Sequence, residues 1–459
     1  MIVPNPCAPD FRVMKEAESL AAAGHEVSVF CVAVPGLPRD EVRAGVRYQR
    51  LEWKGASPRQ ALEQLFRWRK QAPTTTEPRA QQASVPSSGP PNPASGGCVP
   101  NPAPNSGRLA KLLGAERAAV VRAWLRDRSQ TLHQPWLAAS FGRSFEAALI
   151  ASRADVIHAH DLPALPVASR VAMKTGAAFI FDSHELETHR NPPLSPARRR
   201  QVERLEARLL PKAAAVITVG DCIADHLATR YAIPRPLVLY NTPRAADQSP
   251  RCDQDPGLRM RAGMPEDSFL LVYTGNVAIN RGLETVVAAL GQLRQNAPEH
   301  GFGRPVCLVT VGRSPPSVAA RLSRLAQEAG VIDRLAMLPP VPPEDVSCVI
   351  ASADAAIIPI IPVALSYQYA MPNKLFEALM AGLPVIGSDL AEMGPFLRDR
   401  QLGLTFPAGD ASALAETILT MARARPGTFR KLAAESIGWE AQAERLVEFY
   451  QHLDQEQRD

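Results

Sequence analysis

Residues 367–394 read YQYAMPNKLFEALMAGLPVIGSDLAEMG, and this order of residues predicts a loop, a helix, a tight turn and a strand. Pro372 suits the first turn of the helix, Gly382 suits the residue after its carboxyl end, and Pro384 suits the start of the strand. The apolar run after Pro384 is typical of a strand that is buried on both faces of a parallel sheet. The stretch therefore predicts one helix–strand unit of an α/β sheet.

The amino end of the same helix carries residues that suit a nucleotide. Asn373 and Lys374 lie in its first turn, where free backbone N–H groups and the positive end of the helix dipole attract phosphate. Glu377 follows Lys374 by three residues and lies on the same face one turn deeper, where a carboxylate can accept hydrogen bonds from the two hydroxyls of a ribose. The alternative is a surface helix with an ordinary ion pair between Lys374 and Glu377.

Short apolar runs alternate with helix-length stretches on both sides of this window, which indicates repeated βαβ units. The runs are VSVFCVAV, ADVIHAH, AAFIFDS, AAVITVG and PLVLYN in the first half, and FLLVYTG, VCLVTVG, LAMLPPV, AAIIPII and LPVIGSD in the second. The expected fold class is α/β, with two doubly wound, Rossmann-like parallel sheets that face each other across a cleft. Because ligands bind at the carboxyl ends of such strands, we expect the site residues directly after these runs.

The polar stretch 241–268 separates the two series of strands and marks the domain boundary. We expect an N-terminal domain over residues 1–245, a C-terminal domain over 265–430, and a helical segment over 431–459 that crosses back. Residues 71–108 contain nine prolines and almost no large apolar side chain, a composition that predicts a disordered insert within the first domain.

Composition excludes several classes of protein. Apolar residues make up 46% and charged residues 21% of the 459 residues, as in ordinary globular chains. The formal net charge of +5 is small for this length and does not favour a nucleic-acid-binding protein. Seven cysteines without a CxxC pair favour neither a disulfide framework nor a zinc site. Since there is also no long apolar run and no signal-peptide pattern, we expect a cytoplasmic protein.

Several motifs of other enzyme classes are absent or misplaced. The sequence has no P-loop, no GxGxxG and no GxSxG, which removes the commonest kinase, dehydrogenase and hydrolase patterns. HELETH at residues 184–189 separates its histidines by five residues rather than four, so they do not share a helical face for zinc. Asp253 and Asp255 form a DxD pair in the polar interdomain stretch rather than at a strand end. We therefore expect no metal site and no cofactor.

The window PNKLFEALMAGLPVIGSD resembles the donor-binding signature of the family 4 retaining glycosyltransferases of GT-B fold. Weaker resemblances extend along most of the chain, in DFRVMKEAESLAAAGHEVSVF, DVIHAHDLPAL, FDSHELE, AAAVITVGDCIADHLATRYAIP, LYNTP and YTGNVAINRGLETVVAAL. The motifs in the second half are the more specific ones. The resemblance implies an acceptor-side first domain and a second domain that binds a nucleotide sugar.

The donor site that the resemblance implies lies in the second domain. Its residues are Gly275, Asn276, Arg281, Tyr369, Asn373, Lys374 and Glu377. Arg281 and Lys374 would contact the diphosphate and Glu377 the ribose. Tyr369 departs from the family, because it stands eight residues before Glu377, where a first glutamate usually touches the donor sugar. Asn276 also departs, from an arginine that is often found there.

The acceptor side that the resemblance implies lies at strand ends of the first domain. Its residues are Asp10, Arg12, His160, Asp161, His184 and Glu185. His184 resembles the family histidine close to the reaction centre, so the expected catalytic residues are His184, Arg281 and Lys374. For His160 and His184 the alternative is a histidine of the core or of a helix cap.

The activity that the resemblance implies is transfer of a sugar from a nucleotide-sugar donor to an acceptor hydroxyl with retention of configuration. The product would be a cell-surface polysaccharide, a glycolipid or another glycoconjugate, and the acceptor a sugar, a lipid-linked molecule or a small molecule. The departing diphosphate would be stabilised without a metal ion. Two alternatives remain, a non-catalytic nucleotide-binding protein of the same fold and a sugar-nucleotide epimerase.

The stretch ARRRQVERLEARLLPK at residues 197–212 predicts a helix with a basic face. Its basic side carries Arg200, Arg204 and Arg208, and another side carries Val202, Leu205 and Leu209. Such a helix can lie on an anionic membrane that holds a lipid-linked acceptor, which would make the protein peripheral at the inner membrane surface. The alternative is a basic face that is simply exposed to solvent.

Overall fold

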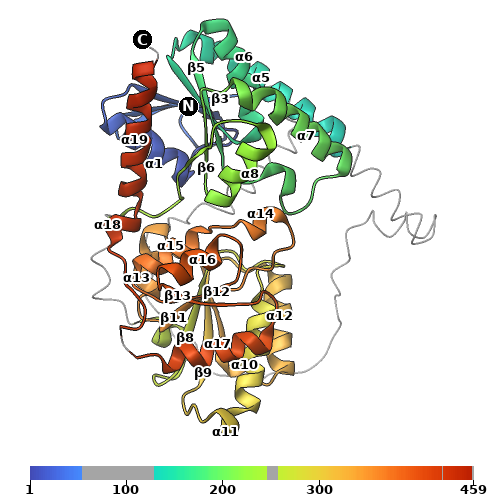
Figure 1. The fold of residues 1–459 in the computed structure, drawn as a ribbon, viewed down its shortest axis with the longest axis vertical. Coiled ribbons are helices and arrows are strands. Elements are labelled where there is room, and N and C mark those ends of the chain that lie inside the picture. The colour runs from blue at the N-terminus through green and yellow to red at the C-terminus, as the bar shows by residue number, and fades with distance from the viewer. Residues whose placement is uncertain (54–128, 246–256, 426, 457–459) are drawn as a thin grey trace, which may run out of the picture.

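A computed structural model describes residues 1–53, 129–245, 257–425 and 427–456. Figure 1 shows two α/β units one above the other, the N-terminal unit at the top and the C-terminal unit below it. The Pro-rich insert expected over 71–108 and the DxD pair of Asp253 and Asp255 lie outside the described residues.

The C-terminal unit is built on a six-stranded, entirely parallel sheet. In spatial order its strands are β10 (Leu335–Leu338), β9 (Val306–Val311), β8 (Phe269–Thr274), β11 (Ala355–Ile358), β12 (Val385–Ser388) and β13 (Gly403–Phe406). Strands β8, β9, β11 and β12 are buried along their whole length, as continuous apolar runs predict. The apolar runs predicted five of these strands and missed β13.

Helices cover both faces of this sheet and complete two apolar clusters. The longer ones are α10 (Leu283–Gln295), α12 (Pro316–Glu328), α15 (Asn373–Met380) and α17 (Ala411–Arg423). Shorter helices are α9 (Leu258–Ala262), α11 (Ala297–His300), α13 (Val346–Ile350), α14 (Leu365–Gln368) and α16 (Met393–Asp399).

The N-terminal unit has a sheet in two parts. Four parallel strands, β4 (Val156–His160), β5 (Ala178–Ser183), β6 (Ala215–Thr218) and β7 (Leu237–Val238), form one part in this order. The other part has β1 (Val27–Val32), β3 (Val46–Leu51) and β2 (Asp40–Arg43), with β2 antiparallel to β3. Ile2 bridges to Phe30 and to Ala159 and so joins the two parts.

The hairpin of β2 and β3 was not predicted. Its strands lack a continuous apolar run, because β2 is mostly exposed and β3 alternates buried and more exposed residues. This period-two pattern belongs to a sheet that is covered on one face only, so it differs from the buried parallel strands around it.

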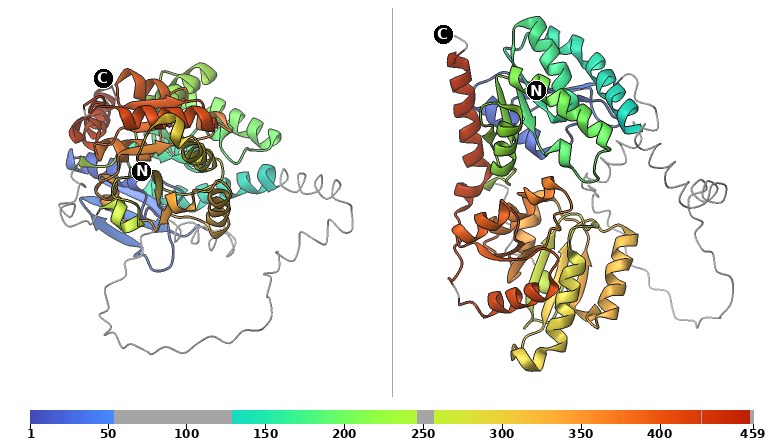
Figure 2. Two further views of the ribbon diagram at one scale, coloured as in Figure 1. Left: turned by 90° about the horizontal axis from the view of Figure 1, so that it is seen from below. Right: turned by 45° about the vertical axis from the view of Figure 1, so that its right-hand side comes forward.

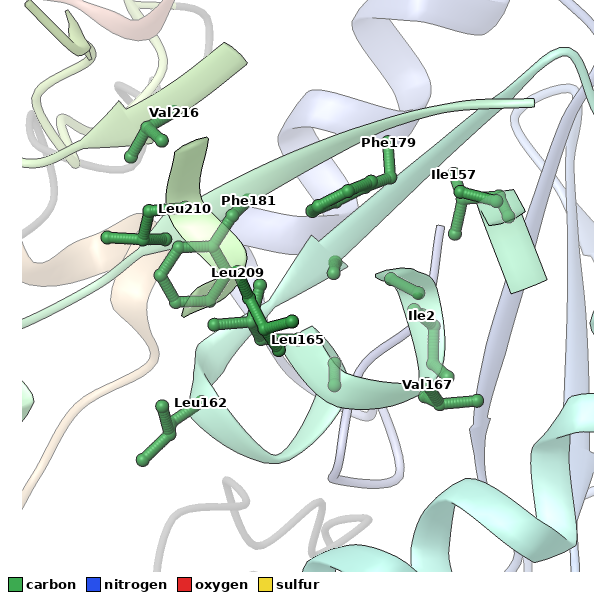
Figure 3. Close-up of a cluster of buried hydrophobic side chains, with 14 of the residues drawn as sticks. Ile2, Ile157, Leu162, Leu165, Val167, Phe179, Phe181, Leu209, Leu210 and Val216 are labelled. Atoms are coloured by element: carbon green, nitrogen blue, oxygen red, sulfur yellow. The ribbon is translucent and has the colours of Figure 1, made fainter. Parts of the chain in front are cut away.

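Helices pack the parallel strands of the N-terminal unit into an apolar core. They are α5 (Gln134–Ala151), α6 (Asp161–Thr175), α7 (Pro196–Leu209) and α8 (Asp221–Tyr231). Figure 3 shows Phe179 and Phe181 of β5 among Leu165 of α6 and Leu209 and Leu210 at the end of α7.

The C-terminal helix crosses back to the N-terminal unit, as Figures 1 and 2 show. Helix α18 (Ala434–Ile437) leads into α19 (Trp439–Glu456), which packs on α1 (Phe11–Ala22). Trp439 Nε1 donates a hydrogen bond of 2.9 Å to Ser19 Oγ of α1, and Leu446 and Tyr450 are buried against the same core. The expected fold class, with two Rossmann-like units and a crossing helix, is confirmed.

Two further observations concern the chain as a whole. None of the described helices combines the length and the apolar character needed to cross a membrane. Cys7, Cys31, Cys222 and Cys307 have free thiols. Cys348 is disulfide-bonded, although the number and spacing of the cysteines did not favour a disulfide framework.

Gly282 provides a test of the packing that places Arg281. Its φ of +77° favours glycine, and a Cβ at this position would lie 1.6 Å from the carbonyl oxygen of Pro359. We expect Gly282→Ala to destabilise the protein by at least twice as much as Gly330→Ala, which should cost about 1 to 2 kcal/mol. Gly330 is the matched control because its φ is +68° and no atom lies within 4 Å of an added Cβ. Urea unfolding of both variants measures the difference in the free energy of unfolding. Equal losses of stability would contradict the close approach of Gly282 to Pro359.

Candidate functional site

The donor-side residues gather where β8 ends and α15 begins. Helix α15 starts directly after Pro372, so Asn373 and Lys374 lie in its first turn, as the sequence predicts. Lys374 Nζ lies 3.5 Å from the ring centroid of Tyr273 and next to Gly275, where an added Cβ would be 3.7 Å away. Gly275 follows β8 with a φ of +92°, a conformation that favours glycine.

Glu377 and Thr274 connect the helix to the strand. Thr274 Oγ1 donates a hydrogen bond of 2.9 Å to Glu377 Oε2. Burial raises the pKa of Glu377, while this hydrogen bond, Lys374 and Lys15 of the N-terminal unit act in the opposite direction. Sequence reasoning missed Thr274 and Lys15, although Thr274 is the last residue of a predicted strand.

Two basic side chains share this site. Burial lowers the pKa of Lys374 well below its ordinary value, and the neighbouring guanidinium of Arg281 lowers it further, against the effect of Glu377. The Arg281 guanidinium lies over the ring of Tyr367, 5.2 Å from its centroid. Because Arg281 disfavours the charged form of Lys374, an anion bound beside both side chains would favour that charged form.

The remaining donor-side residues differ in position. Asn276 and Asn373 are exposed, and the backbone carbonyl of Asn276 accepts a hydrogen bond of 2.9 Å from the Tyr273 hydroxyl. Tyr369 instead packs against the core of the N-terminal unit, with its ring 6.2 Å from the ring of His226 on α8.

On the acceptor side His184 lies between two carboxylates. Its Nδ1 is 3.3 Å from Asp161 Oδ1, and its Nε2 is 3.2 Å from Asp182 Oδ2. Burial alone would lower the pKa of His184, but Asp161 and Asp182 outweigh burial and raise it to about 10. At neutral pH this side chain is therefore an imidazolium, which can donate a hydrogen bond or stabilise negative charge but cannot accept a proton.

Arg12 and His160 lie in the core of the N-terminal unit, with at most 3% of either residue exposed. Arg12 Nε and Nη2 donate hydrogen bonds of 2.9 and 3.0 Å to the two oxygens of Asp182. His160 Nδ1 is 3.3 Å from the same carboxylate. Both side chains are therefore held by Asp182, which sequence reasoning missed, and the acceptor contacts of Arg12 and His160 stay a prediction.

Asp10 and Glu185 lie near this network without joining it. Asp10 is the N-cap of α1 and accepts hydrogen bonds from the backbone N–H of Val13 and from Asn5 Nδ2, at 3.3 and 2.7 Å. Glu185 is half-buried, and burial followed by the neighbouring Glu187 raises its pKa.

A direct contact joins the two units. Both oxygens of Glu392, which lies between β12 and α16, accept hydrogen bonds from the backbone N–H groups of Asp221 and Cys222, at 2.7 and 2.9 Å. These N–H groups are at the amino end of α8, where a carboxylate interacts favourably with the helix dipole. Burial nevertheless raises the pKa of Glu392 to about 7. No pattern in the sequence indicates this contact, because it depends on how the two units meet.

Comparisons with known proteins identify the family of the chain. Residues 268–424 match the family "Glycosyl transferases group 1", and residues 98–242 match the family "Glycosyl transferase 4-like domain". The chain belongs to the group 1, or family 4, glycosyltransferases. It is thus an enzyme of a retaining glycosyltransferase family, with one matched region in each unit.

Similar sequences include two D-inositol 3-phosphate glycosyltransferases. The one from Streptomyces scabiei is 25% identical over 315 residues, which are 64% of this chain and 67% of that protein. The one from Frankia alni is 24% identical over 314 residues, 65% of this chain and 74% of that protein.

Solved structures confirm the GT-B fold. The sucrose-phosphate synthase of Thermosynechococcus elongatus superposes on this glycosyltransferase with a TM-score of 0.64 and 20% identity, over 98% of each chain. HepE of Anabaena in complex with UDP has a TM-score of 0.55 and 16% identity, over 69% of this chain and 82% of that one.

The charge of His184 can be tested through Asp161. We expect Asp161→Asn to lower the pKa of His184 by about one to three pH units, because a nearby opposite charge is lost. Asn also tolerates the φ of +63° that Asp161 adopts. Histidine NMR signals followed over pH 5 to 11 measure the change, and Asp399→Asn, at an exposed position of the other unit, is the control. An unchanged titration of His184 in Asp161→Asn would exclude this ion pair.

The same pair has a consequence for stability. Since the pKa of His184 in the folded protein lies above the ordinary value of 6.5, the imidazolium stabilises the fold. This contribution is complete below pH 6.5 and is lost as the pH rises through about 10. Because burial raises the pKa of Asp161 to about 6, Asp161→Asn should reduce it most near neutral pH, where Asp161 and His184 are both charged.

Proposed function

We propose that the protein transfers a sugar from a nucleotide-sugar donor to an acceptor hydroxyl with retention of configuration. The C-terminal domain, residues 265–430, would bind the donor, and the N-terminal domain, residues 1–245, would bind the acceptor. The single observation that carries the proposal is a pair of neighbouring basic side chains, Lys374 in the first turn of α15 and Arg281 beside it, with the carboxylate of Glu377 one turn further along α15. That arrangement suits a diphosphate attached to a ribose.

Each donor-side residue has a role in this proposal. Arg281 and Lys374 neutralise the diphosphate, and the backbone N–H groups at Asn373 add hydrogen bonds to it. Gly275 lets the phosphates approach the end of β8, with Asn276 beside it. Glu377 accepts hydrogen bonds from the ribose hydroxyls in place of the one that it now accepts from Thr274. A second structure of HepE, a complex with UDP-glucose, supports a nucleotide sugar as the donor class.

The chemical step needs stabilisation of a leaving group. The bond between the anomeric carbon and the diphosphate breaks, the acceptor oxygen forms a new bond to that carbon on the same face, and the proton of the acceptor hydroxyl passes to an oxygen of the departing phosphate. Negative charge grows on the diphosphate, where Arg281 and Lys374 would each contribute about 2 to 4 kcal/mol, by analogy with oxyanion donors. Both nitrogens of His184 face carboxylates, so its imidazolium would act on the sugar or the acceptor through its positive charge.

One observation favours a second candidate, a nucleotide-binding protein without transferase activity. Tyr369 stands at the position where the family usually has a glutamate. Its ring packs against the core of the N-terminal unit near His226 of α8. An epimerase is less favoured, because it would need proton-transfer groups around the sugar in the donor half.

The acceptor could be a sugar, a lipid-linked molecule or a small molecule in glycoconjugate synthesis.

A peripheral membrane contact would depend on charge alone. In α7 the apolar side chains of Val202 and Leu209 are buried in the core, so they are not available to enter a bilayer. Arg200, Arg204 and Arg208 are exposed on the opposite side. We therefore propose that a cytoplasmic enzyme touches an anionic surface through these arginines, if its acceptor is lipid-linked.

Glu377→Gln tests the donor site directly. We expect the affinity for a nucleoside diphosphate to fall by about 1 to 3 kcal/mol, since a charged acceptor of two hydrogen bonds becomes a neutral one. Calorimetry with UDP, GDP and ADP in turn measures the change. The control is Glu284→Gln on α10 of the same domain, which should bind like wild type. Equal affinities for Glu377→Gln and wild type would remove Glu377 from the site.

Metal dependence provides an independent test of the two cations. Because Arg281 and Lys374 supply the countercharge of the diphosphate, we expect transfer to persist in excess EDTA. The rate of sugar transfer with and without the chelator measures this. If EDTA abolished transfer and magnesium or manganese restored it, Arg281 and Lys374 would not be the only countercharge of the diphosphate.

A further inference from the structure

A buried cluster lies behind His184 in the N-terminal unit. Glu16 of α1, His158 and His160 of β4 and Asp182 of β5 are each at most 1% exposed, and their polar atoms lie within 4.8 Å of one another. Neither oxygen of Glu16 makes a hydrogen bond, nor does Nε2 of His158 or of His160. Four buried polar atoms that face one another without a hydrogen bond are unusual and require an explanation.

Arg12 cannot satisfy both carboxylates of this cluster. Its Nε and Nη2 donate to Asp182, whereas Glu16 Oε1 lies 3.0 Å from Nε without hydrogen-bond geometry. An ionised carboxylate that is buried without a hydrogen bond costs several kcal/mol, and Asp182 adds a second negative charge beside it. Burial and Asp182 accordingly raise the pKa of Glu16 to about 8, against the effects of Arg12 and His184.

The two histidines offer a place for the proton of a neutral Glu16. Nδ1 of His160 lies 3.3 Å both from Asp182 and from Nε2 of His184. In the arrangement we propose, Nδ1 carries the proton toward Asp182 and Nε2 of His160 presents a lone pair. Nδ1 of His158 is 2.8 Å from the hydroxyl of Tyr450 on α19. The Nε2 atoms of His158 and His160 lie 3.7 and 4.0 Å from Glu16 Oε2, so both nitrogens are neighbours of the oxygen that would carry the proton.

A divalent cation would also find ligands here, since two imidazoles and a carboxylate form a common set. The guanidinium of Arg12, however, lies 3.0 Å from Glu16 and places a positive charge inside such a shell. His184, a second cation, is 3.2 Å from Asp182. Repulsion from these two charges favours a proton over a metal ion.

We propose that Glu16 is a positioning residue of the transfer site, which in its neutral, protonated form shares one buried proton with His158 and His160. This leaves Arg12 fully paired with Asp182, the carboxylate that holds His184. Through His158 the cluster also reaches Tyr450, so the crossing helix α19 supports the same arrangement. The expected effect on catalysis rests on the function proposed above for His184. The sharing of the proton among Glu16, His158 and His160 does not depend on that function.

The first experiment tests the proton without measuring activity. The ring signals of 13C-labelled histidines are followed from pH 6 to 9.5 in wild type and in Glu16→Gln. We expect His158 and His160 to shift together near pH 8, where Glu16 ionises, and the amide variant to lack this transition. Glu18→Gln is the control, because Glu18 lies on the same helix but pairs with Arg244. A transition near pH 8 that survives in Glu16→Gln, or is absent from wild type, would overturn the proposal.

Thermal unfolding and metal titration complete this test. Because the folded-state pKa of Glu16 lies above its ordinary value of 4.5, wild type loses stability as the pH rises from 4.5 through about 8. The melting temperature of Glu16→Gln relative to wild type should therefore rise over that range. Stoichiometric binding of Co²⁺ or Zn²⁺ that Glu16→Gln abolishes would instead make the cluster a metal site and overturn the proposal.

Kinetics separate positioning from simple packing. We expect Glu16→Ala to lower kcat at pH 7 about tenfold or more with the donor KM unchanged, and Glu16→Gln to restore most of that loss. Affinity for UDP, measured in both variants, reports whether the C-terminal domain is intact. If Glu16→Gln lowers kcat as far as Glu16→Ala, the neutral-acid role is wrong. If wild type transfers no sugar, the proposed function fails while the histidine titration still decides the state of Glu16.

Discussion

The buried ion pair between Arg12 and Asp182 connects the parts of the N-terminal unit on which its site depends. Arg12 comes from the first helix and Asp182 from the centre of the sheet, and the third hydrogen bond of Arg12, at 2.8 Å, goes to the carbonyl of Leu239. Leu239 follows β7, where the chain leaves for the second unit. Loss of one partner of such a pair typically costs about 3 to 5 kcal/mol, because the other charge remains buried. Helix, sheet and connection are therefore fixed relative to one another by two side chains.

The same pair sets the electrostatics of the acceptor side. Asp182 stays ionised because Arg12 compensates its burial, and an ionised Asp182 keeps His184 protonated together with Asp161. The transfer proposed here needs no basic histidine if the departing phosphate takes the proton of the acceptor hydroxyl. The chemistry we propose thus divides between the units, with an imidazolium facing the acceptor and two cations facing the phosphates.

Contacts between the units explain how these halves are held together. Glu392 binds the amino end of α8, and the ring of Tyr240 lies 5.3 Å from that of Phe376 on α15, the helix that carries Lys374 and Glu377. The crossing helix α19 adds Trp439 and Tyr450 to the core of the first unit. Movement of one unit relative to the other would therefore change the surroundings of both proposed half-sites, as hinge motions in enzymes do.

The sequence alone determined the elements that depend on local pattern. Continuous apolar runs predicted the buried parallel strands, and Pro372, Lys374 and Gly382 predicted the start, the charge and the end of α15, because these signals act within a few residues. It did not predict the β2–β3 hairpin, whose strands are only half-buried. Tertiary structure alone decided which charges meet: Arg12 and Asp182 are 170 residues apart, His158 and Tyr450 are 292 apart, and Glu392 reaches α8 from the other unit. The reason is physical, since burial and pKa depend on distances in space, and these exist only after the sheets and helices have packed.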